Sequence, residues 1–154
     1  MIRLFWLAIV TSTFLMAAIG VFWVQRSFVA VTVNGLSMSP AFETGDRVLI
    51  RRGSRGLRKG RVVVVVRPDI ETGWGSKPLE DRDVDANRWY IKRAVALSGE
   101  SFPEQMKKDG VVPDGHIVVI GDNLRSVDSK QHGPCPTHQV LGVVVRRLTR
   151  STAA

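Results

Sequence analysis

Hydrophobic and polar positions divide this 154-residue chain into an apolar start and a strand-rich remainder. Residues 4–24 carry no charged side chain, and they lie between Arg3 and Arg26. At ~1.5 Å per residue, a helix of about 21 residues reaches across the ~30 Å apolar core of a bilayer. Aromatic residues near both ends suit the membrane interface. The pattern predicts one N-terminal transmembrane helix.

A cleaved signal peptide is the alternative interpretation of the same segment. Its apolar region would normally span ~7–15 residues, and the run here is longer. The small residues at 17–18 are followed directly by further apolar residues. An uncleaved signal-anchor over residues 1–26 is therefore the preferred prediction. Basic residues on both sides of the run leave its orientation open.

β-Branched runs bounded by Gly, Pro, Asn or Asp dominate the chain after residue 26. Residues 62–66 are continuous valine, which predicts a strand buried on both faces. The pattern indicates a mainly β domain over residues 27–150, a barrel or sandwich of short strands, and a tail at 151–154. Loops or loose hairpins are expected at 69–88 and 101–114, with at most one helical turn at 105–108. The predicted strands are 29–33, 47–50, 61–66, 89–97, 117–120 and 140–148.

The net charge of +8 is concentrated in two clusters. No aromatic residue is interleaved in the first cluster, which argues against a nucleic-acid partner of the base-stacking kind. With an apolar anchor in the same chain, anionic lipid headgroups are the preferred partner, and a solvated loop and tail are the alternative. The clusters are Arg47, Arg51, Arg52, Arg55, Arg58, Lys59 and Arg61, and Arg146, Arg147 and Arg150.

The sequence also bears on disulfide, metal and cofactor chemistry. Cys135 is the only cysteine, so no intrachain disulfide can form. No metal-ligand spacing, phosphate loop or dinucleotide fingerprint is present, so neither a metal nor a cofactor is expected.

Candidate chemistry begins with Ser37, in the segment Asn-Gly-Leu-Ser-Met-Ser-Pro at residues 34–40. Gly35 and Pro40 constrain the backbone around this hydroxyl, although such a serine is most often a turn residue. A serine that attacks an amide needs a base, and a lysine can serve if burial keeps its amine neutral. Lys92 lies in the apolar strand 89–97, where alternation places it on the same face as Tyr90. A solvent-facing lysine is the alternative interpretation.

A third stretch, Gly-Asp-Asn-Leu-Arg-Ser-Val-Asp-Ser-Lys at residues 121–130, is a polar loop after a predicted strand. In this order, the three stretches resemble the conserved boxes of type I signal peptidases, the S26 family of Ser–Lys proteases. The resemblance runs from about residue 31 to residue 148. It is to a small single-anchor bacterial form, and the chain is also similar to mitochondrial inner membrane peptidase subunits. Only 28 residues separate Lys92 from Gly121, so the second β domain inserted in larger members is absent.

The resemblance implies a role for each matching residue. Ser37 would be the nucleophile, Lys92 the general base, and Ser126 the hydroxyl that orients the amine. Gly35 occupies the position of an oxyanion-hole serine in better-studied bacterial members, so the oxyanion would rest on backbone N–H groups, chiefly that of Ser37. The family usually has Arg at the position of Lys130. Supporting roles are expected for Gly121, Asp122, Asn123, Asp128 and Lys130, and substrate contacts for Met38, Tyr90, Ile91 and Arg93.

The function implied by the resemblance is a membrane-bound serine endopeptidase. It would remove signal peptides from translocated preproteins after an Ala-x-Ala pattern, on the outer face of a bacterial cytoplasmic membrane. Alternatives are a specialised processing peptidase with few substrates, a mitochondrial inner-membrane relative, and a non-catalytic membrane-anchored β domain. A self-cleaving repressor with the same dyad is disfavoured, because no DNA-binding domain is evident. The sequence leaves open whether a partner subunit is required.

Overall fold

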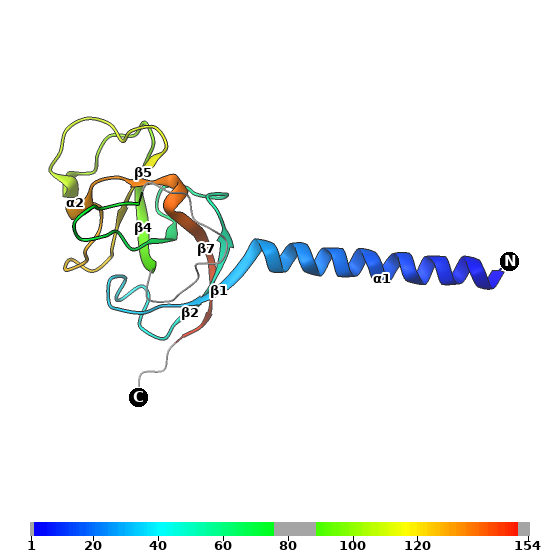
Figure 1. Ribbon diagram of the computed structural model, residues 1–154. Helices are drawn as coiled ribbons and strands as arrows, with labels where there is room; N and C mark the ends of the chain where they lie inside the picture. The colour runs from blue at the N-terminus through cyan, green and yellow to red at the C-terminus, as the bar shows by residue number, and fades with distance from the viewer. Residues whose placement is uncertain (1, 76–88, 151–154) are drawn as a thin grey trace.

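The computed structural model describes residues 2–75 and 89–150. The predicted tail at 151–154 and residues 76–88 of the predicted loop at 69–88 lie outside the described residues. An N-terminal helix, α1 (Ile2–Ser27), leads directly into a curled β-sheet. Figure 1 shows that α1 extends away from the sheet, and that the strands form a compact domain at the C-terminal end of the helix.

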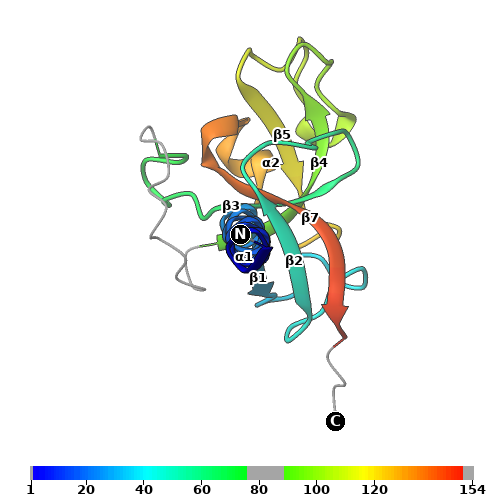
Figure 2. The ribbon, with the colours of Figure 1, turned by 90° about the vertical axis from the view of Figure 1, so that its right-hand side faces the viewer.

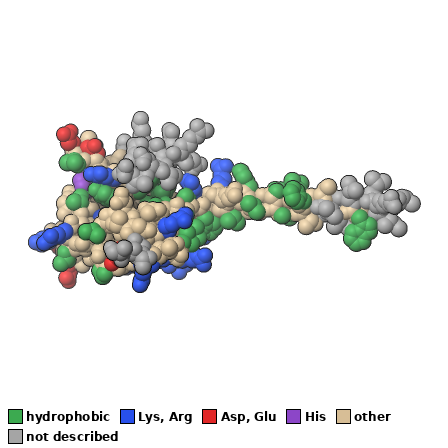
Figure 3. Space-filling model, turned by 90° about the horizontal axis from the view of Figure 1, so that it is seen from below, with side chains coloured by type: hydrophobic (Ala, Val, Ile, Leu, Met, Phe, Trp, Pro, Cys, Tyr) green, Lys and Arg blue, Asp and Glu red, His purple; other side chains and the backbone are tan. Residues whose placement is uncertain are grey.

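The helix α1 follows the predicted apolar segment, and large hydrophobic side chains are exposed along it (Figure 3). The sheet leaves Phe14, Leu15, Phe22 and Trp23 uncovered, each more than half exposed. Within the described residues, no helix combines the length and apolarity needed to cross a membrane, and the predicted transmembrane helix is therefore not confirmed.

Seven antiparallel strands form one sheet in the order β1-β2-β7-β3-β4-β5-β6 (Figures 1 and 2). This confirms the mainly β prediction, and the predicted strands match β1–β5 and β7 to within one or two residues at each end. The strand β6, only two residues long, was not predicted. The strands are β1 (Phe28–Thr32), β2 (Arg47–Arg52), β3 (Val62–Val66), β4 (Trp89–Leu97), β5 (His116–Ile120), β6 (Cys135–Pro136) and β7 (Val140–Thr149).

The five valines of β3 lie at the centre of the sheet, between β7 and β4. Val62 and Val64 belong to one buried hydrophobic cluster, and Val63 and Val65 belong to another. Because successive side chains of a strand point to opposite faces, the continuous valine run fills both cores. The prediction of a strand buried on both faces is confirmed.

Short helical turns connect the later strands. A 3-10 turn, η2 (Glu104–Met106), overlaps the single turn predicted at 105–108. A four-residue helix, α2 (Ser129–His132), follows the loop after β5, and a second 3-10 turn, η3 (Thr137–Gln139), precedes β7. Cys135 is fully buried in β6.

Candidate active site

Lys92 lies near the middle of β4 with its side chain inside the protein. Aromatic and β-branched residues favour an extended conformation in this segment, and alternation along the strand directs Tyr90 and Lys92 to the same face. Only 2% of Lys92 is exposed. Its Nζ donates a hydrogen bond to Ser126 Oγ at 2.5 Å and lies 4.7 Å from the centre of the Tyr90 ring. A lysine amine is thus enclosed next to a hydroxyl.

Burial changes the acid–base behaviour of this amine. Removal from water disfavours the charged form and lowers the pKa of Lys92 from 10.5 to about 8. The carboxylate of Asp128 acts in the opposite direction and raises this pKa, whereas the positive charge of Lys130 lowers it further. The neutral amine is therefore accessible near the pH at which most enzymes work.

Ser37 is held in a tight loop that follows β1. The loop turns at Gly35, whose φ of 93° lies in the left-handed region that glycine tolerates. Thr44 Oγ1 accepts a hydrogen bond from Gly35 N at 3.1 Å and donates one to Gly35 O at 3.2 Å. Met38 is completely buried and belongs to the core. Between these two fixed points, Ser37 Oγ donates to the carbonyl of Ile91 on β4 at 3.2 Å.

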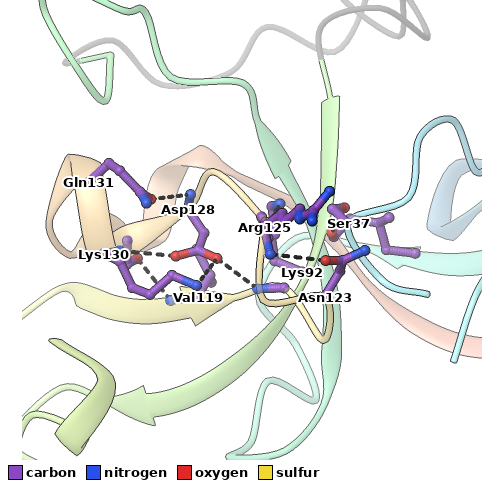
Figure 4. A network of polar contacts seen from close by, with 12 residues as sticks. Ser37, Lys92, Val119, Asn123, Arg125, Asp128, Lys130 and Gln131 are labelled. Atoms are coloured by element: carbon purple, nitrogen blue, oxygen red, sulfur yellow. Dashed lines mark hydrogen bonds and ion pairs between the residues drawn. The ribbon is translucent and has the colours of Figure 1, made fainter. Parts of the chain in front are cut away.

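The loop after β5 brings Ser126 against Lys92 and Ser37. Asn123 N donates to Ser37 O at 3.1 Å, which ties this loop to the serine loop, and Figure 4 shows Asn123 beside Ser37. Gly121 allows the close approach: a Cβ at this position would lie 2.2 Å from Ser126 Oγ and 2.5 Å from Ser37 O. Any larger residue at Gly121 would force the two loops apart.

Asp128 stabilises the far end of the same loop (Figure 4). It is fully buried, and its carboxylate accepts hydrogen bonds from Gly121 N and Lys130 N, both at 3.0 Å. Its side chain also caps α2, in a capping box completed by Gln131. Lys130 Nζ lies 3.4 Å from Asp128 Oδ2, a single ion-pair contact in place of an arginine fork.

Two residues predicted to contact substrate have different surroundings in the structure. Arg93 forms a two-bond fork with Asp122, with Nε–Oδ1 at 2.8 Å and Nη2–Oδ2 at 2.6 Å, and Nη1 donates to Gly60 O at 2.8 Å. The guanidinium thus connects β4 to the loop after β5. The buried side chain of Met38 is packed in the core. In this conformation both side chains have structural partners, and neither lines the cleft.

An open cleft of about 360 Å³ contains the candidate groups. Ser37, Lys92 and Ser126 all line it, as does the predicted substrate-contacting residue Tyr90. The sequence analysis did not predict three of the lining residues, Leu36, Arg125 and Val127. Their only signal in the sequence is that each is adjacent to a predicted site residue. The full lining is Leu36, Ser37, Tyr90, Lys92, Asn123, Arg125, Ser126 and Val127. Within the described residues, no group of His, Cys, Asp and Glu side chains is arranged to hold a metal ion.

Among the described residues, no strand pairs with one edge of the first part of β4, beside this cleft. Trp89–Arg93 pair with β3, whereas pairing with β5 begins only at Arg93. The backbone N–H and C=O of Ala94 are hydrogen-bonded to the segment before β3. Successive residues of a strand direct these groups to alternate edges, and Ile91 lies three residues before Ala94. The backbone groups of Ile91 therefore face the edge opposite to β3. A small apolar pocket lies next to this edge, between residues 31–34 and Trp89, Tyr90 and Ile91.

A serine hydroxyl and a desolvated lysine amine therefore line the same cleft, next to a strand edge. Residues 4–103 and 101–149 match the family described as signal peptidase, peptidase S26. The chain belongs to this family, as the sequence predicted.

The relatives include bacterial, mitochondrial and chloroplast proteins. The chain is 31% identical over 127 residues to mitochondrial inner membrane protease subunit 1 of Xenopus tropicalis, covering 77% of this chain and 67% of that one. It is 28% identical over 162 residues to probable signal peptidase I-1 of Synechocystis sp., covering 87% and 79%. It is 24% identical over 140 residues to signal peptidase I V of Bacillus subtilis, covering 76% and 83%.

Proposed function

We propose that the protein is a membrane-bound serine endopeptidase that removes signal peptides from translocated preproteins, with Ser37 as nucleophile and Lys92 as general base. The observation that carries this proposal is the enclosed amine of Lys92, whose pKa is lowered to about 8 and which shares a cleft with the hydroxyl of Ser37. Membership of the signal peptidase family supports the same reaction.

The first half of the reaction forms an acyl-enzyme. Ser37 Oγ leaves the carbonyl of Ile91, transfers its proton to neutral Lys92 Nζ, and attacks the scissile carbonyl carbon. The protonated amine then gives this proton to the leaving nitrogen as the C–N bond breaks. Ser126 accepts a hydrogen bond from Lys92 Nζ and so keeps the amine oriented through both transfers.

The second half regenerates the enzyme. Lys92, neutral again, takes a proton from water as the water oxygen attacks the acyl carbon, and Ser37 leaves with the returned proton. In both halves the negative charge on the substrate oxygen is stabilised by the backbone N–H of Ser37, because Gly35 has no side chain to contribute.

The substrate would bind as an added strand along the open edge of β4. An extended peptide there can donate to Ile91 O and accept from Ile91 N, which supplies main-chain affinity for any sequence. Side chains two residues apart point to the same side of a strand, so the residues one and three before the cut enter neighbouring pockets. The small apolar pocket beside Trp89 supports a preference for small residues, as in Ala-x-Ala.

We propose that α1 anchors the chain in a bacterial cytoplasmic membrane, with the β domain on the outer face; the mitochondrial inner membrane is the alternative. The uncharged run at residues 4–24 and the uncovered apolar side chains of α1 support an anchor. Because no described helix meets the requirements for a span, the anchor needs its own test. Extraction of membranes with alkaline carbonate should leave the chain in the pellet, and its release would refute the anchor.

The catalytic proposal is tested with a preprotein that carries Ala-x-Ala before the cut. Wild type, Ser37→Ala and Lys92→Met are incubated with it in detergent, and the cut is located by mass spectrometry. Cleavage after the second Ala by wild type alone is expected. Equal cleavage by all three proteins would show that other residues are responsible and would refute the site.

A narrower role is the second candidate. Relatives that match this chain include a protease named as a subunit and a thylakoidal processing peptidase. A specialised processing peptidase, or one that needs a partner subunit, would use the same Ser–Lys chemistry. A panel of preproteins distinguishes the two roles: a general signal peptidase cuts most of them, whereas a specialised one cuts few.

A further inference from the structure

Basic side chains gather at the end of the β domain from which α1 leaves. Between Asp46 and Asp69 the chain contains eight arginine and lysine residues and no acidic residue. The pairing of Arg51 with Phe28 places Arg51 beside the first residue after α1. Arg26 lies in the last turn of the helix itself. Figure 3 shows blue side chains around the base of the helix on the face in view.

The loop between β2 and β3 extends this positive surface. Arg51 pairs with Val143, which in turn pairs with Val63, so β3 starts at the same end of the sheet. Both ends of the loop that connects the two strands therefore lie at that end, and Arg55 and Arg58 are exposed on the loop. We name this surface the basic collar and define it by Arg26, Arg51, Arg55 and Arg58, all exposed.

We infer that the basic collar binds the headgroups of anionic lipids and so holds the β domain against the membrane surface; this inference relies on the proposed membrane anchor. A helix that enters the bilayer would bring the collar to the headgroup layer, where each nearby arginine adds attraction to anionic lipid. A contact of this type is electrostatic and therefore weakens with salt. Glu100 reaches the same loop and lies 3.6 Å from Lys59. Among the described residues, none of the four collar arginines is paired with a carboxylate in this way.

The test uses the full chain with a fluorophore next to the collar. Ser54 is exposed in the β2–β3 loop, and Ser54→Cys provides a labelling site, since the native thiol of Cys135 is fully buried. The labelled protein is placed in nanodiscs of phosphatidylcholine alone or of phosphatidylcholine mixed with phosphatidylglycerol. A polarity-sensitive label should shift to the blue only in the anionic discs, and high salt should reverse the shift.

Matched charge removals make the test specific. Arg55→Gln with Arg58→Gln should reduce the equilibrium constant for contact between the loop and lipid roughly 25-fold, because each arginine contributes about fivefold. Lys107→Gln with Lys108→Gln removes the same charge from another exposed loop and should leave the signal unchanged. Equal signals in neutral and anionic discs, or equal effects of the two double variants, would overturn the inference.

Failure of the anchor gives a different result. A chain without a membrane-embedded helix would not enter nanodiscs of either composition. In that case the same labelled protein is floated with anionic vesicles: salt-sensitive flotation would retain the collar and reject the anchor, and no flotation would overturn both. A response to duplex DNA and none to anionic lipid would identify a nucleic-acid surface and overturn the lipid assignment.

Discussion

The Nζ of Lys92 and the Oγ of Ser126 are 2.5 Å apart, although 34 positions separate the two residues along the chain. The contact joins the middle of β4 to the loop after β5, and both side chains are buried. The hydroxyl of Ser126 orients the amine of Lys92. A hydrogen bond to the charged form of the amine also favours its protonation.

Ser126→Ala should lower kcat/KM by about 10²-fold, because the amine loses its orienting partner. The same change should move the pH–activity midpoint downward, since the protonated amine loses a hydrogen bond. A pH profile of kcat/KM for wild type and variant measures both effects. Ser98→Ala, at an exposed position on another loop, is the control and should behave as wild type. A lower rate with an unchanged midpoint would contradict the contact between the two side chains.

Activity should rise with pH and reach half of its maximum near pH 8. In the proposed mechanism, Lys92 accepts the proton of Ser37 only as a neutral amine. Its pKa is lowered to about 8, so the active fraction would grow as the pH passes through this value. The measurement is the pH dependence of kcat/KM over roughly two pH units on each side of this midpoint.

Lys130 provides a direct check on this assignment. Its positive charge lowers the pKa of Lys92, so Lys130→Gln should move the midpoint to higher pH, and Lys130→Arg should keep it in place. A profile that responds to neither variant, or that shifts downward with Lys130→Gln, would mean that another group titrates.

Gly121→Ala should abolish most of the activity and destabilise the fold by about 1–3 kcal/mol, because the new methyl group overlaps Ser126 and the backbone of Ser37. Gly75→Ala is the matched control: its Cβ would meet Gln139 at 3.6 Å, an ordinary contact. Urea unfolding gives the stability change, and preprotein cleavage gives the activity. Full activity of Gly121→Ala would refute the close approach of the two loops.

Arg93→Lys should destabilise the protein by about 1 kcal/mol and lower activity, since lysine cannot form the two parallel bonds to Asp122. Asp122 precedes Asn123, whose N–H donates a hydrogen bond to Ser37 O. A weaker interaction between residue 93 and Asp122 would therefore disturb the site indirectly. Arg61→Lys, an exposed change nearby, is the comparison. Thermal unfolding and cleavage rates measure the two effects, and identical behaviour of both variants would show that the fork contributes nothing.

The strands were predictable from local patterns because their β-branched runs and boundary residues are contiguous in the sequence. The burial of Val62–Val66 followed from a run with no polar side. Alternation places Lys92 on the same face as Tyr90, but a solvent-facing lysine fits the same pattern, so its burial was expected only from the family resemblance.

Relationships between distant segments could not be read from the sequence. The fork of Arg93 depends on Asp122 being brought across the sheet, a pairing that the sequence does not show. The burial of Met38 depends on how the serine loop folds back onto the core. The strand β6 has only two residues, too few to show a period, and its pairing with β5 alone defines it.

The direct passage from α1 through β1 to Ser37 limits how far the cut can lie from the helix. Nine residues separate Ser27, the last residue of α1, from Ser37, and an extended chain covers at most ~3.5 Å per residue, or about 35 Å over the ten steps. Pairing of β1 with β2 makes this connection stiff. With α1 in a membrane, this connection would set the maximum distance between the bilayer and the bond that is cut. Preproteins would then be sorted by the depth of their scissile bond as well as by its sequence.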